Sequence, residues 1–268
     1  MKKQAPITEL CTHSLTDIHY RDANLVTELL GKKSFTEVMF MQITARVPTA
    51  TDLRIVDAIM ITLMEHGMTP SAIATRLIYM SAPENLQGAV SAGLLAVGSS
   101  FVGTMENCAK LLEEIIQDPA GIEIAAQRIA KHHRENRISI PGFGHHLHKP
   151  DDPRAQKLLE IAAQEVSLNG RHIQALHALA KAVDIAAGKH ITINATGVVA
   201  ALLSEIGIPW KVMRGFAVIS RAAGLVAHIA EEQKHPTGMY IWDLVDHAIP
   251  YVSSKDGHNK STPPEGQS

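Results

Sequence analysis

Apolar residues recur at steps of three and four along most of the chain, and this spacing restricts its fold more than any other feature. Residues 52–65 show the pattern, with an apolar face formed by Leu53, Val56, Ile59 and Leu63. Thr51 or Asp52 is available as the N-cap of this segment. Aromatic residues make up only 4% of the chain, while Ala, Leu, Ile and Met abound, which favours helices over a β-sandwich. We therefore predict an all-α fold.

The same spacing, interrupted by Pro, Gly and capping residues, predicts further helices. One predicted helix starts at 81–84 and runs through Leu94, and another occupies 191–206 after a short extended start. The other predicted helices are 72–80, 102–117, 122–135, 153–166, 171–187, 210–232 and 242–248. The segment 253–268 is polar and contains Pro and Gly, so we predict that it is a disordered tail.

Composition and charge exclude several classes of protein. With 268 residues, 46% of them hydrophobic, the chain can bury a large core and fold without stabilising disulfides or metal ions. The net charge of -2 and the scattered Lys and Arg residues argue against nucleic acid as a partner. Cys11 and Cys108 lie far apart without a CxxC spacing, so no disulfide framework is expected. No window approaches ~18 uninterrupted apolar residues and the N-terminus does not resemble a signal peptide, so we predict no membrane association and a cytoplasmic location.

The segment 138–153 breaks every helical period and is rich in titratable groups. It contains Pro141, Gly142, Gly144, Pro150 and Pro153, together with His145, His146 and His148. Glycines let backbone N–H groups approach a ligand, and His145 has a pKa suited to proton transfer near neutrality. Arg154 follows, where it can clamp a carboxylate. A structural turn with solvated histidines is the alternative interpretation.

A metal site is a further interpretation of this loop. Its ligands would be His145, His146 and His148 with Asp151 or Asp152. Close spacing in a loop bounded by prolines does not enforce tetrahedral geometry, so we predict no metal.

Three other polar positions each allow two interpretations. His66 follows a helix and either complements its dipole or binds a ligand. Asn194 and Thr196 either cap the next helix or contribute to a site. Arg221 lies in an apolar helix, where its charge needs an anionic partner. A bound carboxylate or an internal Asp or Glu would serve equally.

Several motifs together resemble the citrate synthase superfamily. The run Pro141-Gly142-Phe143-Gly144-His145, followed by Asp152-Pro153-Arg154, resembles the superfamily's P-G-[FY]-G-H and DPR signature. Ser34-Phe35-Thr36-Glu37-Val38 and Val47-Pro48-Thr49 resemble its N-terminal region, and SRAAGLVAHIAEE, EQKHP and the WD segment resemble its closing helices. The resemblance is collinear over residues 20–250.

Two positions distinguish this chain within the superfamily. Phe101 stands where synthases have the histidine of an H-G-G-A-N-E type motif, and the citryl-CoA lyase module of ATP-citrate lyase is similar in having phenylalanine there. This favours the lyase branch. Thr196, in Asn194-Ala195-Thr196-Gly197, replaces the aspartate of the N-V-D-[GA] motif, and a threonine cannot take up a proton near pH 7.

The resemblance implies a set of site residues. His66 and His145 would contact the keto acid, Arg154 and Arg221 would bind its carboxylates, and Thr196 would orient a water that relays the missing proton. The backbone of Pro141, Gly142, Phe143 and Gly144 would contact coenzyme A, while Lys149 and Lys189 would meet its phosphates. Coenzyme A would enter as part of the substrate, with no tightly bound cofactor.

The resemblance also implies a homodimer with a large helical lobe, residues 1–103 and 205–252, and a small inserted helical lobe, residues 104–204. The function it implies is a citryl-CoA lyase-like carbon-carbon lyase, which cleaves citryl-CoA or a related 3-hydroxy-3-carboxyacyl-CoA to acetyl-CoA and a 2-keto acid such as oxaloacetate. A catalytically impaired protein that binds CoA or organic acids, and a citrate synthase-type acyltransferase, are the alternatives.

Overall fold

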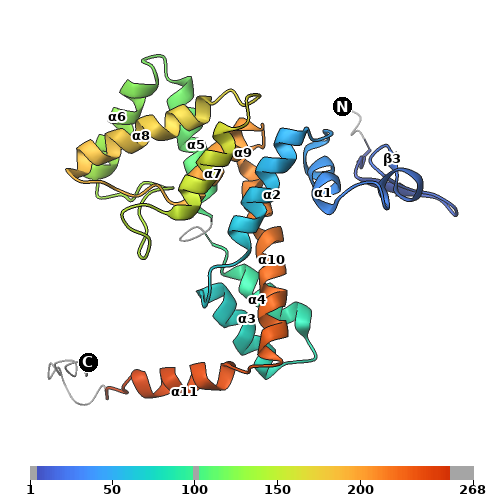
Figure 1. Cartoon of the computed structure of the whole chain (residues 1–268). Helices are drawn as coiled ribbons and strands as arrows, with labels where there is room; N and C mark the ends of the chain where they lie inside the picture. Colours follow the sequence, from blue (N-terminus) through green and yellow to red (C-terminus); the bar gives the residue numbers. More distant parts are fainter. Residues whose placement is uncertain (1–4, 99–102, 254–268) are drawn as a thin grey trace. The chain divides into compact units, whose positions relative to one another are not determined.

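The computed structural model describes residues 5–98 and 103–253. The described chain is mainly helical, which confirms the predicted fold class (Figure 1). Its α-helices are α1 (Phe35–Thr44), α2 (Ala50–Met64), α3 (Pro70–Ser81), α4 (Leu86–Leu95), α5 (Thr104–Gln117), α6 (Ile122–Glu135), α7 (Pro153–Ala163), α8 (Arg171–Ala187), α9 (Ala195–Glu205), α10 (Met213–Glu232) and α11 (Gly238–Ala248). Short helical turns are η1 (Leu25–Leu29) and η2 (Trp210–Val212).

A small antiparallel sheet precedes the helices and has no counterpart in the sequence prediction. Its strands are β1 (Cys11–His13), β2 (Ile18–Tyr20) and β3 (Ala23–Asn24), in the order β1-β2-β3. Thr12 pairs with His19, and Tyr20 pairs with Ala23. Strands of two or three residues are too short for an alternating pattern to be recognised.

The start of α2 differs from the sequence prediction. Thr49, and not Thr51 or Asp52, is the N-cap: its hydroxyl accepts a hydrogen bond from the backbone N–H of Asp52 at 3.1 Å. The Asp52 carboxylate accepts one from the backbone N–H of Thr49 at 2.8 Å. This reciprocal capping box satisfies two N–H groups of the first turn, so the cap prediction was wrong.

The chain divides into two compact units. The first contains residues 1–67 and 94–224, and the second contains residues 68–93 and 225–268. This division is not the one expected from the resemblance, and the lobe boundaries at 103–104 and 204–205 stay a prediction. Of the expected tail, only residue 253 is described.

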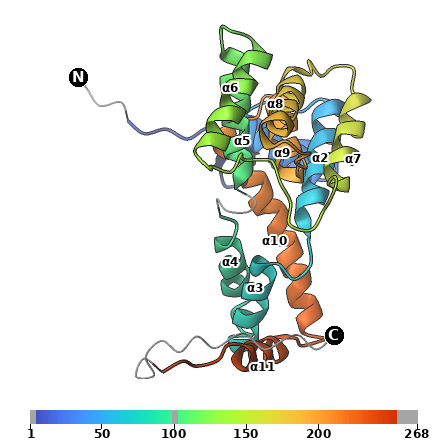
Figure 2. The same ribbon diagram turned by 90° about the vertical axis from the view of Figure 1, so that its left-hand side faces the viewer.

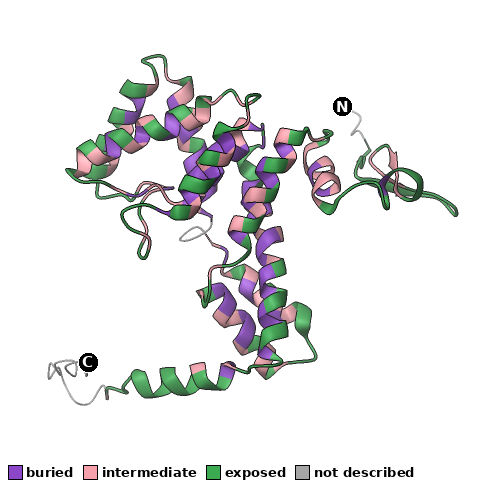
Figure 3. Ribbon diagram, viewed as in Figure 1, coloured by how far each residue is buried: buried purple, intermediate pink, exposed green. Residues whose placement is uncertain are grey.

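In the first unit, α9 is the central helix (Figures 2 and 3). It packs against α2, α5, α7 and α8, and its buried residues are Ala195, Gly197, Val198, Val199, Ala200, Ala201, Leu202 and Leu203. A helix that is apolar on all sides is suited to this position, because every face meets another helix. The N-terminus of α9 is therefore held firmly by the core.

In the second unit, a buried charge cluster lies among α3 and the end of α10. Arg76, 1% exposed, donates to Nδ1 of His228 at 2.9 Å and to the Glu232 carboxylate at 2.7 Å, and it also pairs with Glu231. Helix α11 follows, and Gly238 is its buried residue. Figure 3 shows the rest of α11 mostly exposed, and Trp242 is 59% exposed.

One helical stretch in the described residues, Trp210–Glu232, is long and apolar enough to cross a membrane. Half of its most apolar window is buried within the protein. Core helices of soluble proteins have the same length and composition, so the stretch is weak support for a membrane span. The predicted absence of a membrane partner stays a prediction.

Candidate functional site

The glycine loop, residues 141–144, is fixed against the segment that leads into α9. The backbone N–H of Gly144 donates to the Thr192 carbonyl at 2.7 Å, and Phe143 forms a bridge with Ile193. The Asn194 backbone N–H donates to the Gly142 carbonyl at 3.0 Å, and its side-chain amide donates to the Gly144 carbonyl at 3.0 Å. These bonds hold the loop at the N-terminus of α9.

Gly142 allows this close approach. A Cβ atom at Gly142 would lie 2.7 Å from Sγ of Cys108 and 2.8 Å from Cα of Gly197. The φ angle of Gly142 is +88°, which also disfavours any other residue. The loop backbone therefore packs directly on α5 and α9 at Gly142.

Asp152 connects the loop to two helix N-termini. It is the N-cap of α7, and its fully buried carboxylate accepts bonds from Nε and Nη2 of Arg154 at 3.0 and 2.8 Å. It also accepts the backbone N–H of Ala195, at the start of α9, at 3.0 Å. Burial raises the pKa of Asp152, but the bonds and charge of Arg154 outweigh burial and hold that pKa below its ordinary value. An ionised Asp152 thus fixes the guanidinium of Arg154.

His145 has a defined tautomer. Its Nδ1 atom accepts hydrogen bonds from the backbone N–H groups of Leu147 at 3.1 Å and His148 at 2.9 Å. Because both groups can only donate, Nδ1 carries no hydrogen and Nε2 carries it in the neutral ring. Burial lowers the pKa of His145, and the charges of His148 and Arg154 lower it further. The neutral His145 ring therefore presents an Nε2–H donor. Nη2 of Arg154 lies 3.3 Å from this Nε2 and can also only donate, so the two groups do not bond to each other in this tautomer.

His66 and His148 lie beside this donor. His66 follows the end of α2, and its Nε2 atom lies 3.4 Å from Nε2 of His148. The ring centroid of His145 lies 5.8 Å from that of His66 and 4.4 Å from that of His148. Burial lowers the pKa of His66, and the nearby charges of Arg154, His148 and Arg221 lower it further. The structure thus joins the C-terminal end of α2 to the histidine-rich loop.

Arg221 is buried, with 6% of its surface exposed. Its ion-pair partner is Glu65, whose carboxylate lies 3.5 Å from Nη1. Burial lowers the pKa of Arg221, and the charge of Glu65 offsets part of this effect. Of the two partners considered from the sequence, the internal carboxylate is present, but the pair is long and Glu65 is exposed. A bound carboxylate would add a second negative charge to balance the buried guanidinium of Arg221.

Thr196 lies in the first turn of α9, and its hydroxyl is part of the capping network. It donates to the side-chain oxygen of Asn194 at 2.7 Å, and Asn194 is the N-cap of the helix. The Thr104 hydroxyl lies 2.8 Å from the Thr196 hydroxyl. Since the single hydroxyl hydrogen of Thr196 goes to Asn194, Thr104 donates in this contact. Thr196 can therefore accept a further hydrogen bond in this arrangement but cannot donate one.

The two lysines expected to meet phosphates lie on neighbouring segments. Lys149 and Lys189 are both exposed. Next to them, Nε2 of His190 lies 3.1 Å from the Asp151 carboxylate, and Nδ1 lies 2.9 Å from Asp184. These contacts bring the end of the histidine-rich loop to the connection between α8 and α9.

The histidine cluster has the composition of a metal site but an unsuitable donor set. Ligand atoms of His66, His145 and His148 all lie within 4.8 Å of one another. This trio differs from the set considered from the sequence, which lacked His66. A histidine that binds a metal normally donates its other N–H to an acceptor. Nδ1 of His145 faces two backbone donors instead, so Nε2 keeps its hydrogen and the residues present do not fit a metal.

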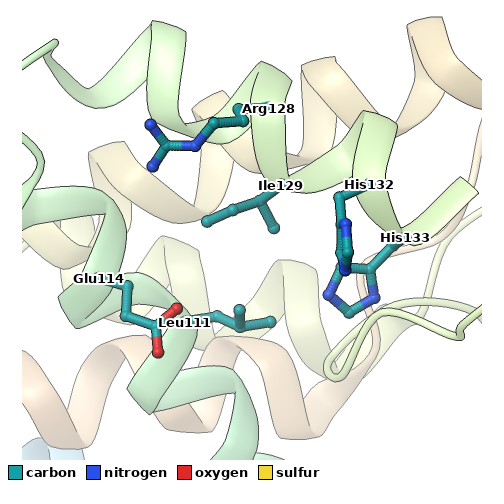
Figure 4. Close-up of a pocket in the computed structure, with 6 residues that line it drawn as sticks. All are labelled: Leu111, Glu114, Arg128, Ile129, His132 and His133. Atoms are coloured by element: carbon teal, nitrogen blue, oxygen red, sulfur yellow. The ribbon is translucent and has the colours of Figure 1, made fainter. Parts of the chain in front are cut away.

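A separate cavity lies between α5 and α6 (Figure 4). It is lined by Leu111, Glu114, Arg128, Ile129, His132 and His133. None of the site residues predicted from the sequence lines it. Arg128 forms an ion pair with Asp118, so its charge is already compensated.

Phe101, on which the choice of branch depends, lies outside the described residues. Among the described ones, the structure brings together His66, His145 and Arg154, with Arg221 close enough for its charge to act on His66. From the sequence, His148 was considered only as a metal ligand beside His145 and His146, and its contact with His66 was missed.

Comparisons with known proteins agree with this architecture. Residues 8–241 match the family described as citrate synthase, C-terminal domain. The probable ATP-citrate synthase subunit 1 of Neurospora crassa is 23% identical over 215 residues, which cover 74% of this chain and 31% of that protein. The chain therefore spans about a third of that relative's length.

Two solved structures are similar over nearly the whole chain. The citryl-CoA lyase from Hydrogenobacter thermophilus has a TM-score of 0.79 and 28% identity, and the match covers 98% of each chain. The ATP citrate lyase from Methanothrix soehngenii, in complex with citrate and coenzyme A, has a TM-score of 0.76 and 18% identity. That match covers 97% of this chain and 44% of the other.

Proposed function

Since the chain belongs to the citrate synthase family, we propose that it is a citryl-CoA lyase-like carbon-carbon lyase. Its substrate would be citryl-CoA or a related 3-hydroxy-3-carboxyacyl-CoA, cleaved to acetyl-CoA and a 2-keto acid such as oxaloacetate. The observation that carries the proposal is the pair of donors formed by Nε2–H of neutral His145 and Nη2 of the fixed Arg154 guanidinium, 3.3 Å apart, which an oxygen of the substrate would accept. The likeness to a citryl-CoA lyase over 98% of both chains supports it.

Retro-aldol cleavage needs groups that bind the substrate carboxylates. It also needs a group that stays hydrogen-bonded to the oxygen on the carbon whose bond is cleaved. Nε2–H of His145 would donate to this oxygen as it changes from hydroxyl to carbonyl. A neutral donor is suitable, because it stabilises partial negative charge without giving up its proton. Arg154 and Arg221 would bind carboxylates, and His66 would contact the keto-acid portion. Thr196 would accept a hydrogen bond from an ordered water.

The coenzyme A portion would lie along the glycine loop. Backbone groups of Pro141, Gly142, Phe143 and Gly144 would contact it, and Lys149 and Lys189 would approach its phosphates. The citrate- and coenzyme A-bound state of the Methanothrix enzyme supports a CoA thioester as substrate. No tightly bound cofactor is required by these roles.

We also propose that the protein is a homodimer. Helix α11 supports this, since its exposed apolar side chains include Met239, Tyr240, Trp242, Leu244 and Val245. An exposed apolar surface of this kind typically packs against a partner protein. Light scattering coupled to size exclusion would measure the mass, and a monomer at assay concentration would contradict the homodimer.

A second candidate is a catalytically impaired protein that binds CoA or organic acids. The specific observation in its favour is the hydroxyl of Thr196, which cannot take up a proton where the family has an aspartate. A synthase-type acyltransferase is a third candidate, and product formation from acetyl-CoA and oxaloacetate would detect it.

The deciding experiment is a cleavage assay with citryl-CoA and a panel of analogues, in which acetyl-CoA is measured by mass spectrometry. A Thr196→Asp variant is assayed beside the native protein. Turnover by the native protein is the expected result. Turnover by the Asp variant alone, with substrate-dependent thermal stabilisation of the native protein, would contradict the lyase and support the binding protein.

A further inference from the structure

The described site lacks a proton acceptor at the position where the family has its aspartate. Thr196 gives its hydrogen to Asn194 and is not basic near pH 7. Asp152 is ionised, but it is fully buried and its oxygens accept bonds from Arg154 and Ala195. Neither group is available to take a proton from a substrate.

His145 is not a proton acceptor either. Its Nδ1 lone pair is occupied by the backbone N–H groups of Leu147 and His148, and Nε2 already carries a hydrogen. Protonation of the ring would place a hydrogen on Nδ1, where it would face the two backbone N–H groups of Leu147 and His148. The residue can therefore donate a hydrogen bond throughout the reaction, but another group must move the proton.

The pair of His66 and His148 has the property that His145 lacks. Their Nε2 atoms face each other at 3.4 Å, so one neutral ring donates Nε2–H to the Nε2 lone pair of the other, and the donating ring carries its own lone pair at Nδ1. This distance is long for a hydrogen bond, and catalytic hydrogen bonds commonly shorten when substrate is bound. Both rings are half-buried, and the His148 ring lies 4.4 Å from that of His145 between centroids. The pair is thus beside the donor and accessible to a ligand.

We propose that His148, paired with His66, is the proton-transfer group of this site and replaces the missing aspartate. This inference rests on the proposed lyase function. While His148 donates Nε2–H to His66, the Nδ1 lone pair of His148 takes the proton of the tertiary hydroxyl, and the C–O⁻ electrons form the keto-acid carbonyl. The bond between C2 and C3 of the acyl group breaks, and its electron pair passes to the thioester enolate. The same proton then returns to C2 and forms the methyl group of acetyl-CoA.

The proton in transit is assigned to His148, because its ring centroid lies 4.4 Å from that of the donor His145, whereas the His66 centroid lies 5.8 Å away. The charges of Arg154 and Arg221 act on His66, and burial also disfavours its protonation. Protonated His148 can still donate Nε2–H to neutral His66, which spreads the charge over a hydrogen-bonded pair. Other groups near the pair are Asp152, whose charge opposes that of the arginines, and Glu65, which accepts the backbone N–H of His66 at 2.7 Å.

The test is His148→Gln, with His146→Gln as the matched control. Substitution of the His148 side chain keeps the backbone N–H that fixes His145, so the His145 tautomer is preserved. His146 is the exposed neighbour, and its ring stacks on His145 with centroids 4.9 Å apart. We expect kcat for citryl-CoA cleavage to fall by ~10²- to 10⁴-fold in His148→Gln, while KM and Tm stay near native values. His146→Gln should cleave at the native rate.

Chemical rescue provides a second measurement. Imidazole added to His148→Ala should restore part of the lost kcat, because free imidazole can carry the proton. Native-like kcat in His148→Gln, with cleavage by the native protein, would overturn the role of His148 and leave the lyase proposal intact. Absence of cleavage by the native protein would overturn both. Loss of native activity on chelation, restored by Zn²⁺, would instead make the histidine cluster a metal site and overturn the proton-transfer role.

Discussion

The backbone N–H of His148 donates to Nδ1 of His145 at 2.9 Å, and this bond determines what His145 can do. With Nδ1 occupied, the neutral ring presents its hydrogen at Nε2. The arrangement is local in sequence, since the donor is three residues from the acceptor. The tautomer of His145 therefore depends on the turn 145–148.

We predict that His145→Ala lowers kcat for citryl-CoA cleavage by ~10²- to 10³-fold, since one preformed donor to a developing oxyanion contributes about that much. His146→Ala, on the exposed neighbour, is the control and should keep the native rate. Steady-state kinetics with mass-spectrometric detection measures both. Unchanged turnover in His145→Ala would exclude the residue from the reaction.

Arg221→Ala should also abolish most cleavage while the protein stays folded. A buried guanidinium that binds a carboxylate contributes ~2–5 kcal/mol, so we expect a loss of about 30- to 5000-fold in kcat/KM. Glu65→Gln is the matched control, because it removes the ion-pair partner at 3.5 Å and leaves the guanidinium in place. Full activity in a folded Arg221→Ala protein would rule out the carboxylate assignment.

Much of the fold could be predicted because helices depend on local spacing. The helix predicted at 122–135 is α6, Ile122–Glu135, and that at 171–187 is α8, Arg171–Ala187. Boundaries were less accurate where a proline or a cap decides them. The segment starting at 81–84 begins its helix at Leu86, and the final helix begins at Gly238 rather than at 242.

The site was predictable in part, for a related reason. His145 and Arg154 occur in one breaker-rich segment, so their spacing alone indicates a site. His66 lies 82 positions from His148 in the sequence, and only the packing of α2 beside α7 brings the two together. The pairing of His148 could not be recognised without this contact. The capping role of Asp152 follows a local pattern, since it directly precedes Pro153 at the first helical position.

The two loop glycines provide a test of close packing. Gly142→Ala should destabilise the protein by ~2–5 kcal/mol, from backbone strain at φ +88° and from the clash with Cys108 and Gly197. Gly144→Ala has a similar φ of +81° but open space around the added methyl group. It should cost only ~1–2 kcal/mol. Denaturant unfolding measures both, and equal losses would show that the loop does not pack on α5 and α9 as described.

The contact of His190 with two carboxylates predicts a pH-dependent stability. Hydrogen bonds to Asp184 and then Asp151 raise the pKa of His190 above its ordinary value of 6.5. A raised pKa contributes stability that is complete below the unfolded value and is lost as pH rises through the folded value. The ring is 48% exposed, so the contribution is at most ~1 kcal/mol.

The Tm of the native protein should therefore exceed that of His190→Gln more at about pH 6 than at about pH 8.5. His177→Gln, on the exposed face of α8, should show no such trend. A difference between native and His190→Gln that grows with pH would mean that the ring is neutral and that the two carboxylates do not hold it.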